Sequence, residues 1–159
     1  MPKKSAGLLL YRPGGDKIRW EVLLVHPGGP FWRKKDEGAW TIPKGEFDAQ
    51  EDPLAAARRE FKEELGADPP SGKPIKLKPV KQAGGKVVHC WAIAGDFDPA
   101  LLSSNTFTHE WPPKSGRLVE FPEVDRAAWY SPEVAKRKIL NGQVPLIEEL
   151  LAILELSKR

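Results

Sequence analysis

The stretch Gly45–Ala67, GEFDAQEDPLAAARREFKEELGA, is the part of the chain from which the fold can be inferred. Its second half predicts a helix from Pro53 to Leu65. Asp52 is a favourable N-cap, and proline is well tolerated in the first turn of a helix. Gly66 is a typical residue for ending a helix. At about 100° per residue, one face of this helix is apolar and can cover a core. That apolar stripe consists of Leu54, Ala57, Phe61 and Leu65.

Three glutamates lie on the flank beside the apolar stripe. Glu60, Glu63 and Glu64 are spaced i, i+3, i+4, whereas Arg59 and Lys62 are expected to point away from them. Carboxylates this close repel one another unless a cation lies between them. Mg²⁺ prefers oxygen ligands from a few carboxylates, with water and substrate phosphates completing its shell. The flank is therefore a candidate metal site for phosphate chemistry, and the alternative is an ordinary solvated charged surface.

The spacing of the whole stretch is more specific than the glutamates alone. Gly45 is followed by five residues and Glu51, and then by seven residues and REFKEELGA, which begins at Arg59. Every fixed position matches the Nudix box: Gly, five residues, Glu, seven residues, then Arg-Glu-apolar-any-Glu-Glu-apolar-Gly-apolar. The sequence therefore resembles a Nudix hydrolase.

The resemblance implies an α/β fold, the Nudix-type α/β/α sandwich around a mixed β-sheet, with the box at residues 45–67. It implies a divalent metal site whose ligands are Glu60, Glu63, Glu64 and the backbone carbonyl of Gly45. Mg²⁺ is the expected ion and Mn²⁺ the alternative. The family cleaves a nucleoside diphosphate linked to another group, with water attacking phosphorus.

The resemblance also implies supporting roles within the box. Glu63, Glu64 and Arg59 are expected catalytic residues, and Glu51 is expected to support the metal site from the preceding loop. Arg59 is expected to hold Glu60 through a charge-assisted hydrogen bond.

The segment WTIPKGEF, which begins at Trp40, precedes the helix. Its Trp-x-x-Pro-Lys-Gly pattern is similar to that of the asymmetrical diadenosine tetraphosphate hydrolases and of their relatives that act on diphosphoinositol polyphosphates. On that resemblance Trp40 and Lys44 are candidate substrate-binding residues. The alternatives are a core aromatic at Trp40 and a solvated turn residue at Lys44.

A water-activating base is expected outside the box, because the box glutamates can be occupied by metal. The segment RLVEFPEVDRAAWY offers two carboxylates before the last predicted strand. In the dinucleoside polyphosphate branch a glutamate lies about this far ahead of a tryptophan. Counting back from Trp129 favours Glu123, with Glu120 as the second choice. Either is equally consistent with a plain surface carboxylate.

Residues 103–117, SSNTFTHEWPPKSGR, predict a long and mostly irregular excursion. Its aromatic side chains are interleaved with cations, a composition that suits a nucleobase platform with phosphate anchors. Trp111 is the candidate base-stacking residue, with Lys114 or Arg117 near phosphate. The alternative is a loop that packs its aromatic residues, including Phe107 and His109, over a sheet edge.

The rest of the chain predicts strands on both sides of the central helix. Residues 6–11 and 20–26 form apolar runs joined by the turn Gly14-Gly15-Asp16, which is typical of a hairpin. A short strand that ends at Pro43 is expected within residues 39–45. Two strands are expected around the turn Gly84-Gly85, a last strand over 126–131 and an amphipathic helix over 143–156.

Composition narrows the class of protein. With 159 residues, 40% hydrophobic and 30% charged, the chain is expected to form a single domain over 1–159 with a substantial core. No apolar run is long enough to span a bilayer, and the apolar run after the basic pair near the N-terminus is too short for a signal peptide. One cysteine, Cys90, excludes an internal disulfide and a cysteine-based zinc site. A cytoplasmic protein is therefore expected, and a monomer and a homodimer both stay open.

The net charge and the histidine spacing narrow the possible partners and metal sites less than the composition narrows the class of protein. The three histidines, His26, His89 and His109, lack zinc-site spacing. The net charge of +3 and the pI near 9.0 permit an anionic partner, but no dense Lys/Arg stripe favours nucleic acid. No membrane, DNA or RNA partner is expected.

These patterns together favour a Mg²⁺-dependent pyrophosphohydrolase of nucleotide substrates. Dinucleoside polyphosphates such as diadenosine tetraphosphate are the favoured class. The alternatives are a nucleoside triphosphate pyrophosphatase that sanitises the nucleotide pool, a non-catalytic nucleotide sensor with the same fold, and an RNA-end hydrolase. The intact set of glutamates argues against the sensor.

Overall fold

The computed structural model describes residues 3–15 and 19–156. Its longer strands are β1 (Lys4–Pro13), β2 (Trp20–Pro27), β6 (Val87–Ala94) and β9 (Val124–Tyr130). Its shorter strands are β3 (Lys44–Glu46), β4 (Ile75–Lys76), β5 (Val80–Lys81), β7 (Thr106–Glu110) and β8 (Leu118–Pro122). Its helices are α1 (Pro53–Leu65), α2 (Pro132–Lys138) and α3 (Val144–Leu156).

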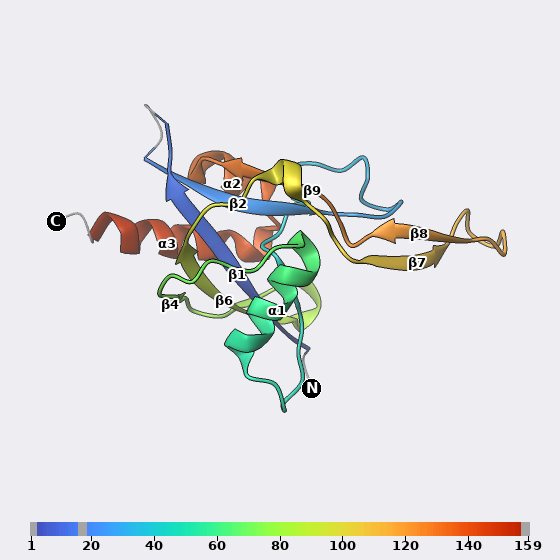
Figure 1. Cartoon of the computed structure of the whole chain (residues 1–159), viewed down its shortest axis with the longest axis horizontal. Coiled ribbons are helices and arrows are strands. Elements are labelled where there is room, and N and C mark those ends of the chain that lie inside the picture. Colours follow the sequence, from blue (N-terminus) through green and yellow to red (C-terminus); the bar gives the residue numbers. More distant parts are fainter. Residues whose placement is uncertain (1–2, 16–18, 157–159) are drawn as a thin grey trace.

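Seven of these strands form one mixed sheet (Figure 1), in the order β4-β6-β1-β2-β9, with β3 also paired to β1 and β5 to β6. β1 runs antiparallel to β2 and parallel to β6. β7 and β8 form a separate antiparallel pair that projects from the body of the molecule. The predicted hairpin at 6–26 is confirmed by the β1–β2 pairing, although Asp16 of its turn lies outside the described residues.

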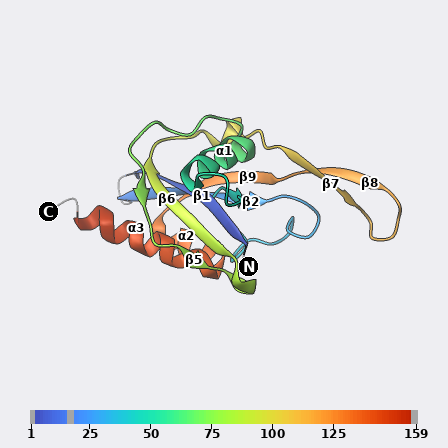
Figure 2. The ribbon, with the colours of Figure 1, turned by 90° about the horizontal axis from the view of Figure 1, so that it is seen from below.

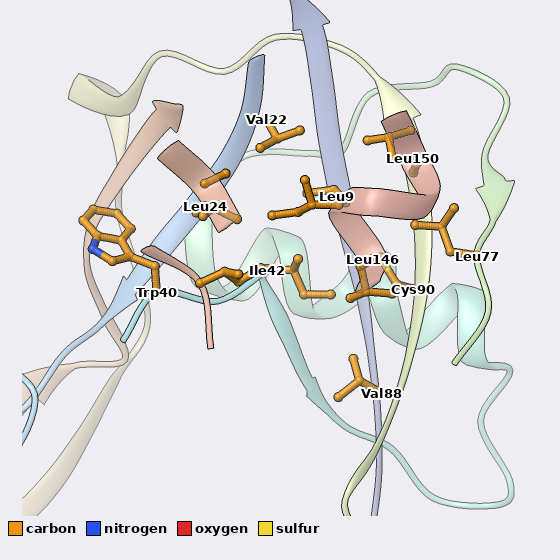
Figure 3. Packing of buried hydrophobic residues seen from close by; sticks show 14 of the residues in the cluster. Leu9, Val22, Leu24, Trp40, Ile42, Leu77, Val88, Cys90, Leu146 and Leu150 are labelled. Atoms are coloured by element: carbon orange, nitrogen blue, oxygen red, sulfur yellow. The ribbon is translucent and has the colours of Figure 1, made fainter. Parts of the chain in front are cut away.

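The two faces of the sheet are covered by different helices. In Figure 2, α1 lies on one side of the sheet and α3 on the other. Apolar side chains of β1 alternate between the two sides, as expected for a central strand that is buried on both faces. Leu8 and Leu10 pack toward α1, whereas Leu9 packs toward α3 with the residues shown in Figure 3. The predicted α/β/α arrangement around a mixed sheet is confirmed.

The helix predicted from Pro53 to Leu65 is present with those bounds. The Asp52 carboxylate accepts a hydrogen bond from the backbone N–H of Ala55 at 3.0 Å. Gly66 ends the helix with φ = 78°, a left-handed conformation that glycine adopts without strain. A Cβ at this position would also lie 2.5 Å from the carbonyl oxygen of Ser103. The helix therefore begins and ends where its sequence specifies.

Three expectations about secondary structure need correction. The strand expected over 39–45 is not continuous: Trp40 and Thr41 make only isolated bridges, and β3 begins after Pro43. Proline has no N–H for a ladder, and the Pro43 carbonyl instead accepts from Leu8 N at 3.2 Å. The region around Gly84-Gly85 contains β5, β6 and one further short strand, β4. α2 was not expected at all.

The excursion over 103–117 is also more regular than expected. Residues 106–110 pair with 118–122 in the β7–β8 hairpin, with Phe107 opposite Phe121 and His109 opposite Val119. Alternating exposure along both strands follows their alternating sequence. The prolines in the connecting segment obscured this two-residue period. We refer to this hairpin, residues 106–122, as the arm.

No helix among the described residues combines the length and the apolar character needed to cross a membrane.

Replacing Phe61 with alanine is expected to lower the free energy of unfolding by about 3–5 kcal/mol. Phe61 is only 1% exposed and packs from α1 against Phe97, with ring centroids 6.5 Å apart. Urea denaturation followed by circular dichroism measures the change. Leu118→Ala is the control, because its side chain is 76% exposed and a change within about 0.5 kcal/mol is expected. A loss below about 1 kcal/mol for Phe61→Ala would contradict this packing.

Candidate active site

A cavity of about 380 Å³ lies beside the glutamate flank of α1. It is bounded by α1, by β3 and by the two segments that lead into and out of the arm. Its lining residues are Lys44, Gly45, Glu46, Glu60, Glu63, Glu64, Asn105 and Glu123. The fold therefore brings the three glutamates of α1, Lys44 directly before the box and the distant Glu123 to one cavity.

The Arg59 guanidinium joins three of the box glutamates. Its Nε and Nη2 donate to the two carboxylate oxygens of Glu51 at 2.8 and 3.0 Å, a bidentate contact. Its Nη1 donates to Glu60 at 2.9 Å and to Glu63 at 3.3 Å. Contrary to the helical-wheel expectation, Arg59 does not point away from the glutamates. The hydrogen bond to Arg59 lowers the pKa of Glu51.

Gly45 lies directly against the Glu60 carboxylate. A Cβ built at residue 45 would fall on the carboxylate carbon of Glu60 and on both of its oxygens. Glu60 is half-buried, and burial together with the nearby Glu63 and Glu123 raises its pKa, against the opposing effect of Arg59. Glycine at residue 45 is therefore what allows a carboxylate from α1 to approach the backbone of β3.

Glu64 is the most perturbed carboxyl group of the cavity. Burial first, and repulsion from Glu60 second, raise the pKa of Glu64 to about 8. The backbone N–H of Lys44 donates to Glu64 at 3.3 Å. Burial also lowers the pKa of the Lys44 ammonium group, and Lys44 and Glu64 both line the cavity.

Asn105 connects the end of α1 to Glu123. Its backbone N–H donates to the carbonyl of Glu63 at 2.9 Å, and its carbonyl accepts from the N–H of Glu123 at 2.8 Å. The neighbouring Ser103 N–H donates to the carbonyl of Leu65 at 3.1 Å. These bonds satisfy carbonyls that a helix end leaves without intrahelical partners. Asn105 and Glu46 were not identified from the sequence, since neither belongs to a fixed position of a motif.

The structure distinguishes the two candidates for the base. Glu123 lines the cavity, just after the end of β8. Glu120 lies within β8, opposite Thr108 of β7, and does not line the cavity. Of the two, only Glu123 lines the cavity beside the box.

Trp40 does not line the cavity, and its expected contact with substrate needs correction. The side chain is 2% exposed and belongs to the core on the α3 side of the sheet (Figure 3). Its indole N–H donates to Asp36 at 2.8 Å, and its ring makes edge contacts with His26 and Tyr130. The core alternative for Trp40 is therefore the one that the structure supports.

Trp111 also lies away from the cavity lining, directly after β7 near the outer end of the arm. Its ring is partly exposed and contacts Phe31. Glu51 and Arg59 line a second cavity, of about 820 Å³, together with the loop before α1.

The carboxylate oxygens of the cavity suit a hard divalent cation, although they are not clustered as the ligands of a metal ion are. Within residues 3–15 and 19–156, no three His, Cys, Asp or Glu side chains are close enough to form a ready metal cluster. Instead Glu60 and Glu63 accept from Arg59, and Glu64 accepts from the backbone of Lys44. Glu60, Glu63 and Glu64 nevertheless line one cavity. The pKa values of Glu60 and Glu64 are raised, mainly by burial, and a bound cation would stabilise the charged form of these carboxylates.

Comparison with known families agrees with this arrangement. Residues 1–150 match the NUDIX domain family. The chain belongs to the NUDIX family. It is accordingly a Nudix hydrolase, an enzyme that cleaves a phosphoanhydride bond, in a family that generally uses divalent metals.

Solved structures share the fold. The chain is 25% identical to C. elegans Ap4A hydrolase, with a TM-score of 0.61 and coverage of 97% of this chain and 99% of that one. A binary complex of a C. elegans Ap4A hydrolase gives 23% identity, a TM-score of 0.66 and coverage of 95% and 98%. The NUDIX domain of Shewanella oneidensis NrtR, complexed with ADP ribose, gives 18% identity, a TM-score of 0.63 and coverage of 97% and 89%.

Substituting alanine for Gly45 is expected to lower kcat by about 100-fold, because the added methyl group displaces the Glu60 carboxylate. The displaced atoms are the end of a flexible side chain, so the melting temperature is expected to stay near that of the wild type. Gly15→Ala is the matched control, since a Cβ at that position meets nothing within 4 Å. Steady-state kinetics and thermal unfolding test both variants. Wild-type kcat in Gly45→Ala would contradict the close approach.

Proposed function

We propose that the protein is a Mg²⁺-dependent pyrophosphohydrolase that cleaves dinucleoside polyphosphates of the diadenosine tetraphosphate type. The observation that carries this proposal is the single cavity in which Glu60, Glu63 and Glu64 face Lys44 and Glu123. Such a cavity offers oxygen donors for a cation, an ammonium group for phosphate and a carboxylate for water.

In this proposal Glu60, Glu63, Glu64 and the carbonyl of Gly45 hold Mg²⁺, with Mn²⁺ as an alternative ion. The bound metal supplies neutralisation of phosphate oxygens and activation of water. Glu51 acts through Arg59: its bidentate contact fixes the guanidinium, which in turn holds Glu60 and Glu63 at the edge of the cavity. Glu63, Glu64 and Arg59 are therefore the box residues on which turnover is expected to depend.

Outside the box, Glu123 is proposed to orient and deprotonate the attacking water. Its backbone is fixed on both sides, because its N–H donates to Asn105 and its carbonyl accepts from Gly28 N at 2.9 Å. Lys44 is proposed to bind a phosphate oxygen of the substrate. Burial lowers the pKa of this ammonium group, with Glu64 opposing the effect, and the same burial strengthens an interaction between the ammonium group and a phosphate oxygen.

Two observations favour dinucleoside polyphosphates among nucleotide substrates. The Trp-x-x-Pro-Lys-Gly pattern resembles the asymmetrical diadenosine tetraphosphate hydrolases, and the chain matches C. elegans Ap4A hydrolase over nearly its whole length at 25% identity.

The single cysteine, Cys90, is buried, which suits a reducing compartment, and we place the enzyme in the cytoplasm.

The proposed substrate class predicts a preference that can be measured. With Mg²⁺ present, kcat/KM for diadenosine tetraphosphate is expected to exceed kcat/KM for canonical and oxidised nucleoside triphosphates. Products separated by ion-exchange chromatography identify the bond that is cleaved, and ATP with AMP is the expected pair. A preference of about 100-fold, or about 2.7 kcal/mol, for any triphosphate would instead assign the enzyme to sanitising the nucleotide pool.

A further inference from the structure

Two segments that are distant in sequence meet in one aromatic cluster at the arm. Phe31 belongs to the loop 28–38, which follows β2. Its ring lies edge-on to His109 and to Trp111, with centroid distances of 5.2 and 5.5 Å. We call these three side chains, Phe31, His109 and Trp111, the aromatic tip. The Phe31 side chain is 58% exposed, so the tip presents ring surface to solvent.

The pairing register places the aromatic tip on one face of the arm. His109 lies opposite Val119, so both side chains share a face, and Trp111 follows His109 by two residues. Glu110 lies opposite Leu118, and these two side chains are on the other face. The arm therefore has an aromatic face and, behind it, a face that carries the exposed Leu118.

The end of the arm is held in one arrangement by its own hydrogen bonds. The Glu110 carboxylate accepts from the backbone N–H groups of Lys114 at 2.9 Å and Gly116 at 3.2 Å. The Trp111 N–H donates to the carbonyl of Arg117 at 2.9 Å. Side chains carried on a fixed turn lose less freedom on binding a ligand than side chains on a mobile loop.

Cationic side chains flank the aromatic tip in the sequence. Arg33, Lys34 and Lys35 are exposed on the loop, and Lys114 and Arg117 are exposed at the end of the arm. The loop's acidic residues are already paired with α2, since Asp36 binds Lys138 and Glu37 lies 3.8 Å from Arg137. At the end of the arm, Glu110 is bound by backbone N–H groups, so these five cations face one carboxylate that has no cationic partner among the described residues. Exposed rings beside cations suit a nucleobase attached to phosphates.

The arm joins this cluster to the cavity. β7 begins directly after Asn105 and β8 ends directly before Glu123, and both of these residues line the cavity. Trp111 is five residues from the start of β7, or about 17 Å along an extended strand. That distance is too long for the base of a nucleotide whose own phosphates occupy the cavity, but it suits a second nucleoside at the far end of a polyphosphate.

From this geometry we infer that the aromatic tip binds the second nucleoside of a dinucleoside polyphosphate, the one remote from the phosphorus that is attacked. Its base stacks on Phe31 or Trp111, and the cations around the tip bind the phosphates that lead to it. This inference rests on the proposed function and adds to it a residue set outside the Nudix box.

The test compares two substrates that differ only in the second nucleoside, diadenosine tetraphosphate and adenosine 5′-tetraphosphate. Trp111→Ala is expected to raise KM for diadenosine tetraphosphate by about tenfold, because stacking of a base is worth about 1–3 kcal/mol. KM for adenosine 5′-tetraphosphate and kcat for both substrates are expected to stay unchanged. Phe31→Ala is expected to act in the same direction, and Trp111→Phe to restore most of the affinity.

Leu118→Ala is the matched control, because it removes an exposed apolar side chain from the opposite face of the same arm. It is expected to change neither KM. Thermal unfolding of each variant is measured alongside, and Phe31→Ala provides the test if Trp111→Ala does not fold.

Three results would overturn the inference. One is an unchanged KM for diadenosine tetraphosphate in both Trp111→Ala and Phe31→Ala. A second is an equal rise in KM for the two substrates, which would show that the second nucleoside is not what the tip contacts. The third is a rise in KM that is seen only for a 5′-triphosphorylated RNA oligonucleotide assayed in parallel, which would mean that the tip binds RNA. A wild-type enzyme that does not cleave diadenosine tetraphosphate would instead refute the proposed function itself.

Discussion

The arrangement of the site depends on how one guanidinium compensates a crowded set of carboxylates. Glu60, Glu63 and Glu64 come from adjacent turns of α1, so their mutual repulsion is built into the helix. Arg59 offsets part of this repulsion by donating to Glu60 and Glu63 while the Glu51 carboxylate holds its other two donor groups. A lysine cannot reproduce this fork, since it lacks the planar set of donors that a bidentate contact requires. The negative charge that remains, on the cavity side, is what a divalent cation would neutralise.

Contacts of its apolar face and of its C-terminal end also hold α1 in position. Its apolar face packs on β1 through Ala57, Phe61 and other buried residues. Its C-terminal carbonyls are bound by the backbone of residues 103–105, which continues to Glu123 and to the arm. A change in the position of α1 would therefore move the box glutamates and Glu123 together. The close packing of Gly45 on Glu60 adds a steric limit on the third side.

Sequence patterns predicted the parts of the molecule in which local chemistry decides the outcome. The bounds of α1 follow from Asp52, Pro53 and Gly66, and the glutamate flank follows from the helical period. Residues whose roles depend on long-range packing were harder to predict. Trp40 precedes the box in a recognisable motif, yet its ring enters the core because His26 and Tyr130 lie next to it in space. Asn105 reaches the cavity only because its backbone bridges α1 and Glu123, and no local pattern encodes such a bridge. The sequence predicts an irregular segment over 103–117 because Pro112 and Pro113, which lie between β7 and β8, interrupt the alternating pattern of the two strands.

The central claim is that the carboxylates of α1 bind a divalent cation at the cavity beside Gly45 and Lys44. The most direct test is a crystal structure of the protein grown with Mn²⁺, with anomalous scattering used to locate the ion. The account predicts an anomalous peak within coordination distance, about 2.0–2.6 Å, of carboxylate oxygens from Glu60, Glu63 or Glu64. It also predicts that this peak disappears in a Glu60→Gln, Glu63→Gln, Glu64→Gln triple variant that retains the fold. Manganese bound only elsewhere on the wild-type protein, with these glutamates still paired to Arg59 and Lys44, would contradict the account.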